Sequence, residues 1–208
     1  MLLELKLRPG IASLLGLGAL LSVGCDRQKA AEPQGAGPAA PPARAAAPAA
    51  SYPTGRLDRS HAGTAVPAAP FEDGEGRSTT LAEFRGRPLL LNLWATWCAP
   101  CVVEMPSLDR LAGREDGRVQ VVAISQDLDG REAVDRFFAR TGLANLEPFL
   151  DGDMALMTAL RIGTLPTTIL YDAEGREVWR MTGMAEWDGE RARRLLAEAE
   201  RVSPSAAR

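Results

Sequence analysis

Beyond residue 70, the apolar positions of the chain follow patterns that change from one segment to the next. Unbroken apolar stretches at Leu89–Trp94 and 119–125 predict two buried strands, because short apolar runs are typical of strands inside a sheet. Apolar and polar residues alternate at 167–172 and 176–182, on either side of the turn residues 173–175. This alternation predicts a β-hairpin near the end of the chain.

Apolar residues recur at helical spacing in three segments. The first segment, 99–113, contains Pro106, which removes one backbone hydrogen bond and predicts a kink. The second, 131–141, is followed by Gly142, a residue typical of helix ends, and the third covers 188–202. The residues expected to face the core from the first segment are Val102, Met105, Leu108 and Leu111.

Shorter elements complete the prediction. The turn residues 73–76 predict a reversal of the chain within 71–80. Residues 81–84 predict a helical turn, 146–150 a short strand and 153–161 a short helix with Asp153 as its N-cap. Strands, crossover helices and a final hairpin together predict an α/β domain with a mixed central sheet and helices on both faces.

The N-terminal third of the chain has a different composition. Residues 1–25 combine early positive charges with a short apolar stretch and predict an export signal. Residues 26–69 are rich in Ala and Pro with little to bury, which predicts a disordered linker. We therefore expect one folded domain at 70–202 and a frayed tail at 203–208.

Charge and cysteine content limit the function further. The net charge is −3, which argues against a nucleic-acid partner. No stretch reaches the roughly 18 continuous apolar residues expected of a membrane-spanning helix. The chain has three cysteines and one histidine, His61, which lies in the predicted linker and is expected to be solvated.

Two of the cysteines, Cys98 and Cys101, follow the first predicted strand and open the first predicted helix. Thiol–disulfide exchange needs one thiolate to attack and a second thiol near enough to resolve the mixed disulfide. The helix N-terminus favours a thiolate at Cys98 over the deeper Cys101, so Cys98 is the expected nucleophile and Cys101 the resolving thiol. Pro100 suits an early helical position, where a missing N–H has no cost.

A permanent disulfide or half of a zinc site are the alternatives for this pair. Zinc requires four ligands, and beyond the pair the chain offers only Cys25 and His61, both far upstream. The tryptophan Trp97 and the buried run before it also favour redox chemistry. We therefore expect a redox-active disulfide and neither a metal nor another cofactor.

The stretch WATWCAPC, followed by EMPSLDRL, GTLPTTILYDAEG and GMAEWDGE, resembles the thioredoxin superfamily. Within it, the chain is similar to the TlpA-like (ResA/TlpA) thiol–disulfide oxidoreductases of bacterial envelopes. The resemblance covers about residues 70–202. It implies a thioredoxin-like fold with an N-terminal hairpin and a strand–helix insertion at 146–161.

The resemblance also assigns residues around the cysteines. Pro166 matches the cis-proline loop of the superfamily, and the backbone of Leu165 would then pair with an extended substrate segment. Asn92 stands at the position where thioredoxin has a buried Asp. By the resemblance, that Asp would accept the proton of the resolving cysteine. Glu104 is the nearest candidate replacement, and the alternative is that it caps or pairs on the helix surface.

Cys25 lies at the end of LLSVGC, which resembles a bacterial lipoprotein box, although Ser22 stands where that box usually has Leu. Lipidation at Cys25, an uncleaved N-terminal anchor and plain secretion all remain open. All three place the domain outside the cytoplasm, and the first two tie it to the inner membrane. The resemblance implies the periplasmic side of the envelope.

The main hypothesis is a reductase of disulfides in partner proteins, because Ala99-Pro100 lacks the histidine of strongly oxidising pairs. The resemblance implies substrates with cysteine pairs, in apocytochrome c or in copper-assembly proteins of cytochrome oxidase. It also implies a membrane electron donor of the DsbD or CcdA type. Three alternatives remain: a peroxiredoxin-like antioxidant protein, a copper chaperone and a redox-inert peptide-binding lipoprotein.

Overall fold

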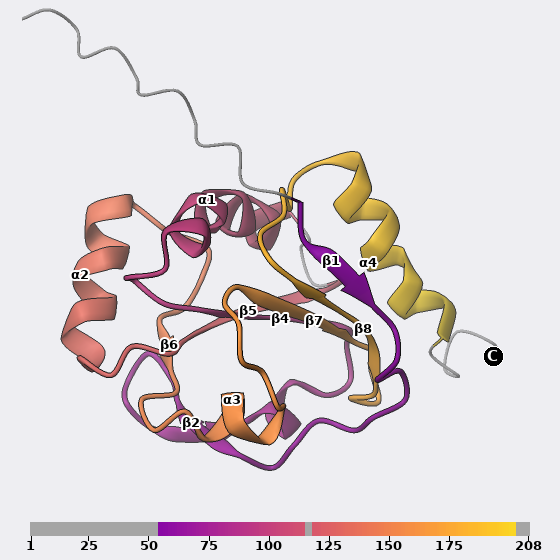
Figure 1. The fold of residues 1–208 in the computed structure, drawn as a ribbon, viewed down its shortest axis with the longest axis horizontal. Coiled ribbons are helices and arrows are strands. Elements are labelled where there is room, and N and C mark those ends of the chain that lie inside the picture. Colours follow the sequence, from indigo (N-terminus) through magenta and orange to yellow (C-terminus); the bar gives the residue numbers. More distant parts are fainter. Residues whose placement is uncertain (1–53, 115–117, 203–208) are drawn as a thin grey trace, which may run out of the picture. The chain divides into compact units, whose positions relative to one another are not determined.

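A computed structural model describes residues 54–114 and 118–202 (Figure 1). The predicted signal at 1–25, Cys25 and the tail at 203–208 lie outside the described residues. The elements in chain order are β1 (Arg56–Asp58), β2 (Pro70–Glu72), β3 (Ser78–Thr80), a 3-10 helix η1 (Leu81–Phe84), β4 (Leu89–Trp94), α1 (Ala99–Arg114), β5 (Gln120–Ser125), α2 (Arg131–Thr141), β6 (Phe149–Leu150), α3 (Ala155–Ala159), β7 (Thr167–Tyr171), β8 (Glu177–Thr182) and α4 (Glu190–Val202).

The strands form one eight-stranded mixed sheet in the order β1-β8-β7-β4-β5-β6-β2-β3. β4 pairs in parallel with β5 and antiparallel with β7. All six residues of β4 are buried, as its unbroken apolar run predicts for a central strand covered on both faces. The cysteine motif directly follows β4 and therefore lies at the edge of the sheet near its middle strands.

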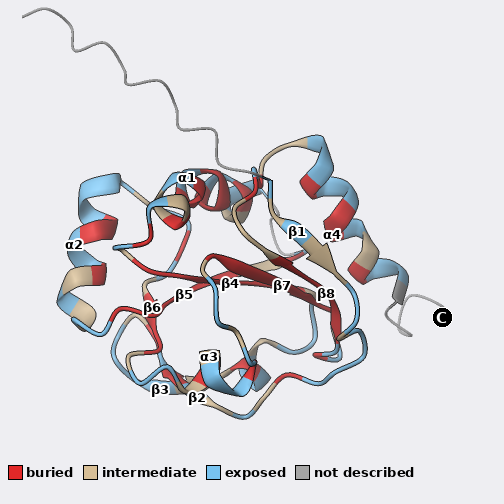
Figure 2. Cartoon of the chain, viewed as in Figure 1, coloured by how far each residue is buried: buried red, intermediate tan, exposed pale blue. Residues whose placement is uncertain are grey.

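Helices cover both faces of the sheet, which confirms the predicted architecture (Figure 1). On one face, α1, α2 and α4 contribute apolar residues to a core that also contains Trp94, Trp179 and both cysteines. On the other face, η1 and α3 pack with the opening hairpin around Leu91 and Ile169. Figure 2 shows the buried residues concentrated along the central strands and on the helix faces turned toward them.

The folded part begins upstream of the predicted boundary at residue 70. Residues 56–58 form β1, which pairs with β8 in the register Arg56↔Thr182, and Val66 is buried. His61, expected to be a solvated linker residue, is half-buried in the turn that follows β1. The prediction was wrong here because a three-residue edge strand held by backbone pairing to β8 leaves no apolar periodicity in its own sequence.

Two short elements also differ from the prediction. The strand expected at 146–150 is limited to β6, which bridges the opening hairpin to the main sheet through the pair Glu72↔Leu150. The helix expected at 153–161 is limited to α3. Its N-cap position belongs to Met154 and not to Asp153. The first N–H groups of the helix, those of Leu156 and Met157, donate instead to the carboxylate of Asp151.

The C-terminus of α2 matches the prediction. Gly142 follows the last helical residue with φ +69°, in the left-handed region, and its N–H donates to the carbonyl of Phe138.

Within the described residues, no helix has the length and apolar character needed to span a membrane.

Candidate active site

The cysteine pair lies where the central strand passes into the first helix. Cys98 and Cys101 form a disulfide with an S–S distance of 2.08 Å and a Cα–Cα distance of 5.2 Å. The carbonyl of Cys98 accepts the first helical hydrogen bond, from Val102 N at 3.0 Å, so Cys98 occupies the N-cap position of α1. Cys98 is 7% exposed and Cys101 is completely buried, so solvent reaches Cys98 first.

The residues around the pair lie as the spacing requires. Pro100 is the second residue of α1, where no intrahelical donor is lost. Trp97, directly before Cys98 in the chain, is 65% exposed. The free N–H groups and the partial positive charge of the helix N-terminus are directed toward Cys98.

The loop before β7 comes to the same end of the sheet. The Leu165–Pro166 peptide is cis, as the resemblance implied. Thr167 pairs with Leu93, so Pro166 lies across from the last residue of β4, four positions before Cys98. Leu165 packs against the apolar cluster that contains both cysteines. The structure therefore brings together the cysteine pair and the loop that the sequence singled out separately.

Asn92 and Glu104 also meet in the structure. Asn92 is fully buried in β4, and its Nδ2 donates to Glu104 Oε1 at 2.8 Å and to Thr168 Oγ1 at 3.0 Å. Glu104 lies three residues after Cys101 on the same helix face and is 1% exposed. The surface role that we kept open for Glu104 is therefore wrong, since its carboxyl faces the protein interior.

The loop after β8 completes the surroundings of Glu104. Glu104 Oε2 accepts from Ala185 N at 2.9 Å and from Trp187 Nε1 at 3.2 Å. Burial raises the pKa of Glu104 from its ordinary value of 4.5 to about 7, and the hydrogen bonds from Ala185, Asn92 and Trp187 partly oppose this rise. A carboxyl of this kind can take up or release a proton near neutral pH.

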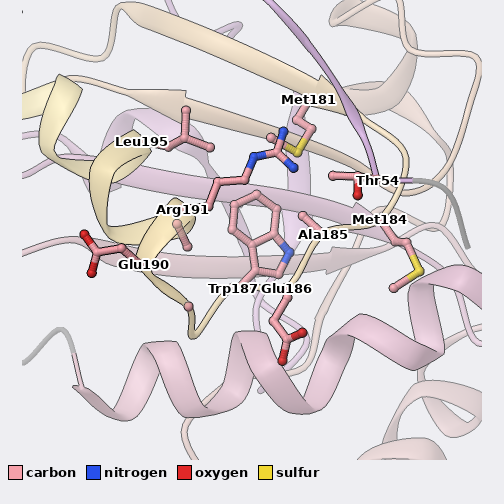
Figure 3. Close-up of a pocket in the computed structure, with 11 residues that line it drawn as sticks. Thr54, Met181, Met184, Ala185, Glu186, Trp187, Glu190, Arg191 and Leu195 are labelled. Carbon is pink, nitrogen blue, oxygen red and sulfur yellow. The ribbon is translucent and has the colours of Figure 1, made fainter. Parts of the chain in front are cut away.

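Two residues of the segment GMAEWDGE thus donate hydrogen bonds to Glu104, a contact that the sequence did not reveal. Trp187 is buried and stacks on Trp179, with ring centroids 6.5 Å apart. Ala185 and Trp187 also line a cavity of about 430 Å³ beside α4, and Figure 3 shows the side chains around Trp187 in its wall. This cavity therefore adjoins the two residues that hold Glu104. Trp187, the one aromatic residue of the loop 183–189, was the sequence signal for this contact.

A second buried carboxylate, Asp127, was also missed. It lies two residues after the end of β5 and accepts from Thr96 N at 2.9 Å, Thr96 Oγ1 at 2.5 Å and Ser125 Oγ at 2.5 Å. Its position could have been found, because β4 and β5 are parallel and the residues after parallel strands meet at one edge of a sheet. In the part of the chain that the structure describes, no cluster of three or more His, Cys, Asp or Glu side chains is placed to hold a metal ion.

A cysteine pair at a helix N-terminus, beside a cis-proline loop and at the end of a central strand, defines a thioredoxin-like thiol–disulfide oxidoreductase. The chain belongs to the Redoxin family, whose model matches residues 61–196. It is 38% identical to the thiol–disulfide oxidoreductase ResA of Halalkalibacterium halodurans over 115 residues, which are 54% of this chain and 64% of the relative. It is 33% identical to ResA of Geobacillus kaustophilus over 132 residues, which are 62% of this chain and 74% of the relative.

A solved structure supports the same fold. A protein from Neisseria meningitidis described as a thioredoxin is 28% identical and superposes with a TM-score of 0.59, covering 69% of this chain and 94% of its own. The match to the two ResA relatives covers only part of their length, namely 64% of the H. halodurans protein and 74% of the G. kaustophilus protein. The chain is therefore similar in sequence to the ResA thiol–disulfide oxidoreductases.

Proposed function

We propose that the protein reduces disulfides in partner proteins, with Cys98 as the nucleophile and Cys101 as the resolving thiol. The observation that carries this proposal is the buried carboxyl of Glu104, three residues after the completely buried Cys101. Glu104 has a pKa near 7, which suits a group that takes the proton from a thiol during attack. It takes the place of the acidic side chain that thioredoxin has where Asn92 stands here.

The steps balance as follows. The Cys98 thiolate attacks one sulfur of the substrate disulfide, the substrate S–S bond breaks, and the leaving thiolate takes a proton. Cys101 then loses its proton to Glu104 and attacks Cys98 Sγ, releasing the second substrate sulfur, which also becomes a thiol. The substrate gains two electrons and two protons, one proton from solvent and one that Cys101 loses by way of Glu104. The enzyme is left with the Cys98–Cys101 disulfide, the state that the structure records.

The groups around the sulfurs support separate roles for the two cysteines. Cys98, at the helix N-cap, has the greater exposure and the stabilising helix dipole. Pro166 keeps a backbone donor away from the sulfurs, and the backbone of Leu165 is available to an extended substrate segment. Trp97 offers an exposed apolar surface on which such a segment can rest.

The partners follow from the class of enzyme. We propose substrates with vicinal cysteine pairs, such as apocytochrome c or a copper-assembly protein of cytochrome oxidase. The oxidised enzyme must be reduced again, and a membrane donor of the DsbD or CcdA type is the proposed source of electrons.

The proposed location is the periplasmic side of the cell envelope, with attachment through Cys25 or an uncleaved N-terminal segment. Mass spectrometry of the mature N-terminus tests the attachment, because lipidation requires a chain that begins at a modified Cys25.

The experiment that tests the activity uses a synthetic peptide with an oxidised Cys-x-x-Cys pair. Incubated with the reduced Cys101→Ser variant, the peptide should become covalently attached through Cys98, because the resolving thiol is missing. Cys98→Ser is the matched control and should trap none. If Cys101→Ser also traps no peptide or protein disulfide, the redox-inert peptide-binding alternative replaces this proposal.

A further inference from the structure

Asp127 is a buried carboxylate close to the cysteine pair that the proposed reaction does not use. Its side chain is completely buried. Three donors approach its two oxygens: Thr96 N, Thr96 Oγ1 and Ser125 Oγ, at 2.9, 2.5 and 2.5 Å. Ser125 Oγ in turn accepts from Asp127 N at 3.1 Å. Both oxygens of Asp127 therefore accept hydrogen bonds, and one of the three donors is a backbone N–H that can only donate.

These hydrogen bonds fix the turn that presents Cys98. Thr96 lies two residues before Cys98, between the end of β4 and the start of α1. Gln126, the residue before Asp127, donates its N–H to the carbonyl of Trp94 at 2.8 Å. Two consecutive residues after β5 therefore form hydrogen bonds with the segment at the end of β4. Gln126 does so through its backbone and Asp127 through its carboxylate.

The charge of Asp127 is held by neutral donors alone. Among the ion pairs of residues 54–114 and 118–202, none includes Asp127. The positive end of α1 begins three residues after Thr96, the hydrogen-bond partner of Asp127, and Cys98 lies at that end. A negative charge in this place opposes the formation of a second one on Cys98. The other buried carboxyl of the region, Glu104, has a different set of hydrogen-bond partners, Asn92, Ala185 and Trp187.

We propose that Asp127 is a positioning residue that holds the Thr96–Cys98 turn and makes the Cys98–Cys101 pair a stronger reductant. Reduction of the pair breaks one S–S bond and adds two electrons. It adds one proton when Cys98 ends as a thiolate and Cys101 as a thiol. Oxidising members of this class have a strongly stabilised reduced form, so a fixed negative charge that disfavours the thiolate shifts the equilibrium toward the disulfide. This inference rests on the proposed function and explains how the chain favours the reducing direction.

The test compares four proteins: the wild type, Asp127→Asn, Thr96→Val and the control Asp129→Asn. Asp129 is exposed two residues further along, and its variant makes the same change of charge. In the measured equilibrium, two molecules of glutathione reduce the protein disulfide to the dithiol and become glutathione disulfide. A larger equilibrium constant therefore means a weaker reductant. The thiolate absorbance of Cys98 is followed against pH in the same proteins.

Asp127→Asn should raise the equilibrium constant by about threefold to tenfold, which is a potential about 15 to 30 mV less negative at 29.6 mV per tenfold change. Cys98 should become a thiolate at a lower pH in that variant. Thr96→Val keeps the charge and removes one of its donors, so its equilibrium constant should fall. Asp129→Asn should match the wild type.

An Asp127→Asn constant equal to that of Asp129→Asn overturns the inference. A rise with Thr96→Val also overturns it, since loosening of the turn and not charge would then be the cause. If Asp127→Asn does not fold, the direction of the Thr96→Val change decides the question alone. A strongly oxidising wild type would contradict the proposed reductase, whereas the ratio between the variants and the wild type would still test Asp127.

Discussion

Replacing Glu104 with glutamine removes the buried carboxyl and keeps the size of the side chain. The carboxyl is held by Asn92, Ala185 and Trp187 at 2.8, 2.9 and 3.2 Å and has almost no contact with solvent. Because the variant changes ionisation more than shape, its effect on stability should depend strongly on pH. That dependence tests whether Glu104 can act as a proton acceptor near neutral pH.

The size and sign of the effect follow from the pKa. Burial raises the pKa of Glu104 in the folded protein to about 7, against an ordinary value of 4.5 in the unfolded chain. Between these two pH values the folded protein keeps a proton that the unfolded chain has released, so the free energy of unfolding falls as the pH rises. At roughly 1.4 kcal/mol for each pKa unit, the whole loss is about 3 kcal/mol. Below pH 4.5 both states are protonated and the cost disappears.

Guanidinium unfolding of the oxidised protein from about pH 4.5 to 7.5 measures this difference. The wild type should lose about 3 kcal/mol of stability relative to Glu104→Gln across that range, because the variant has no proton to release. Glu186→Gln, an exposed neighbour in the same loop, should show no such trend. A constant difference between the wild type and Glu104→Gln would show that the carboxyl ionises normally, and the proposed proton acceptor would be lost.

Two further substitutions test the surroundings of Glu104, and a third tests the C-terminus of α2. Trp187→Phe removes the 3.2 Å hydrogen bond to Glu104, so it should raise the Glu104 pKa and lower stability by about 1 to 2 kcal/mol at pH 7; an unchanged Glu104 titration by carbon-13 NMR would contradict this. Asn92→Asp places a second buried carboxyl 2.8 Å from Glu104 Oε1, so urea unfolding should show a loss of about 3 kcal/mol or more at neutral pH and a smaller loss in acid. Equal losses at both pH values would show that charge is not the cause. Gly142→Ala forces a side chain into φ +69° and should cost about 1 kcal/mol, visible as a lower melting temperature; an unchanged melting temperature would refute it.

The sequence predicted the elements whose signals are local. β4, α1 and α2 carry their own apolar patterns and lie within one residue of the predicted positions. β1 has no such pattern, because its stability comes from backbone pairing with β8 far along the chain. The sequence predicts Asp153 as the N-cap of α3 because Asp favours that position, but Asp151 is the residue whose carboxylate reaches the helix N–H groups.

The site was predictable in its chemistry and less so in its contacts. Cys98 and Cys101 follow from spacing, and Asn92 and Glu104 were each singled out. Their direct hydrogen bond, however, depends on how α1 packs against β4, a distance that no sequence pattern encodes. The contribution of Trp187 depends on a loop more than eighty residues away from Glu104. Such contacts between distant segments are set by tertiary packing and not by local propensity.

The reduction potential of the Cys98–Cys101 pair tests the central claim most directly. Equilibration of the protein with a glutathione or dithiothreitol buffer at pH 7, read out by thiol alkylation, gives this value. A reductase that draws electrons from a membrane donor requires a potential near or below that of thioredoxin, about −270 mV. A potential near that of DsbA, about −120 mV, would contradict the account, because the protein would then donate disulfides to its partners.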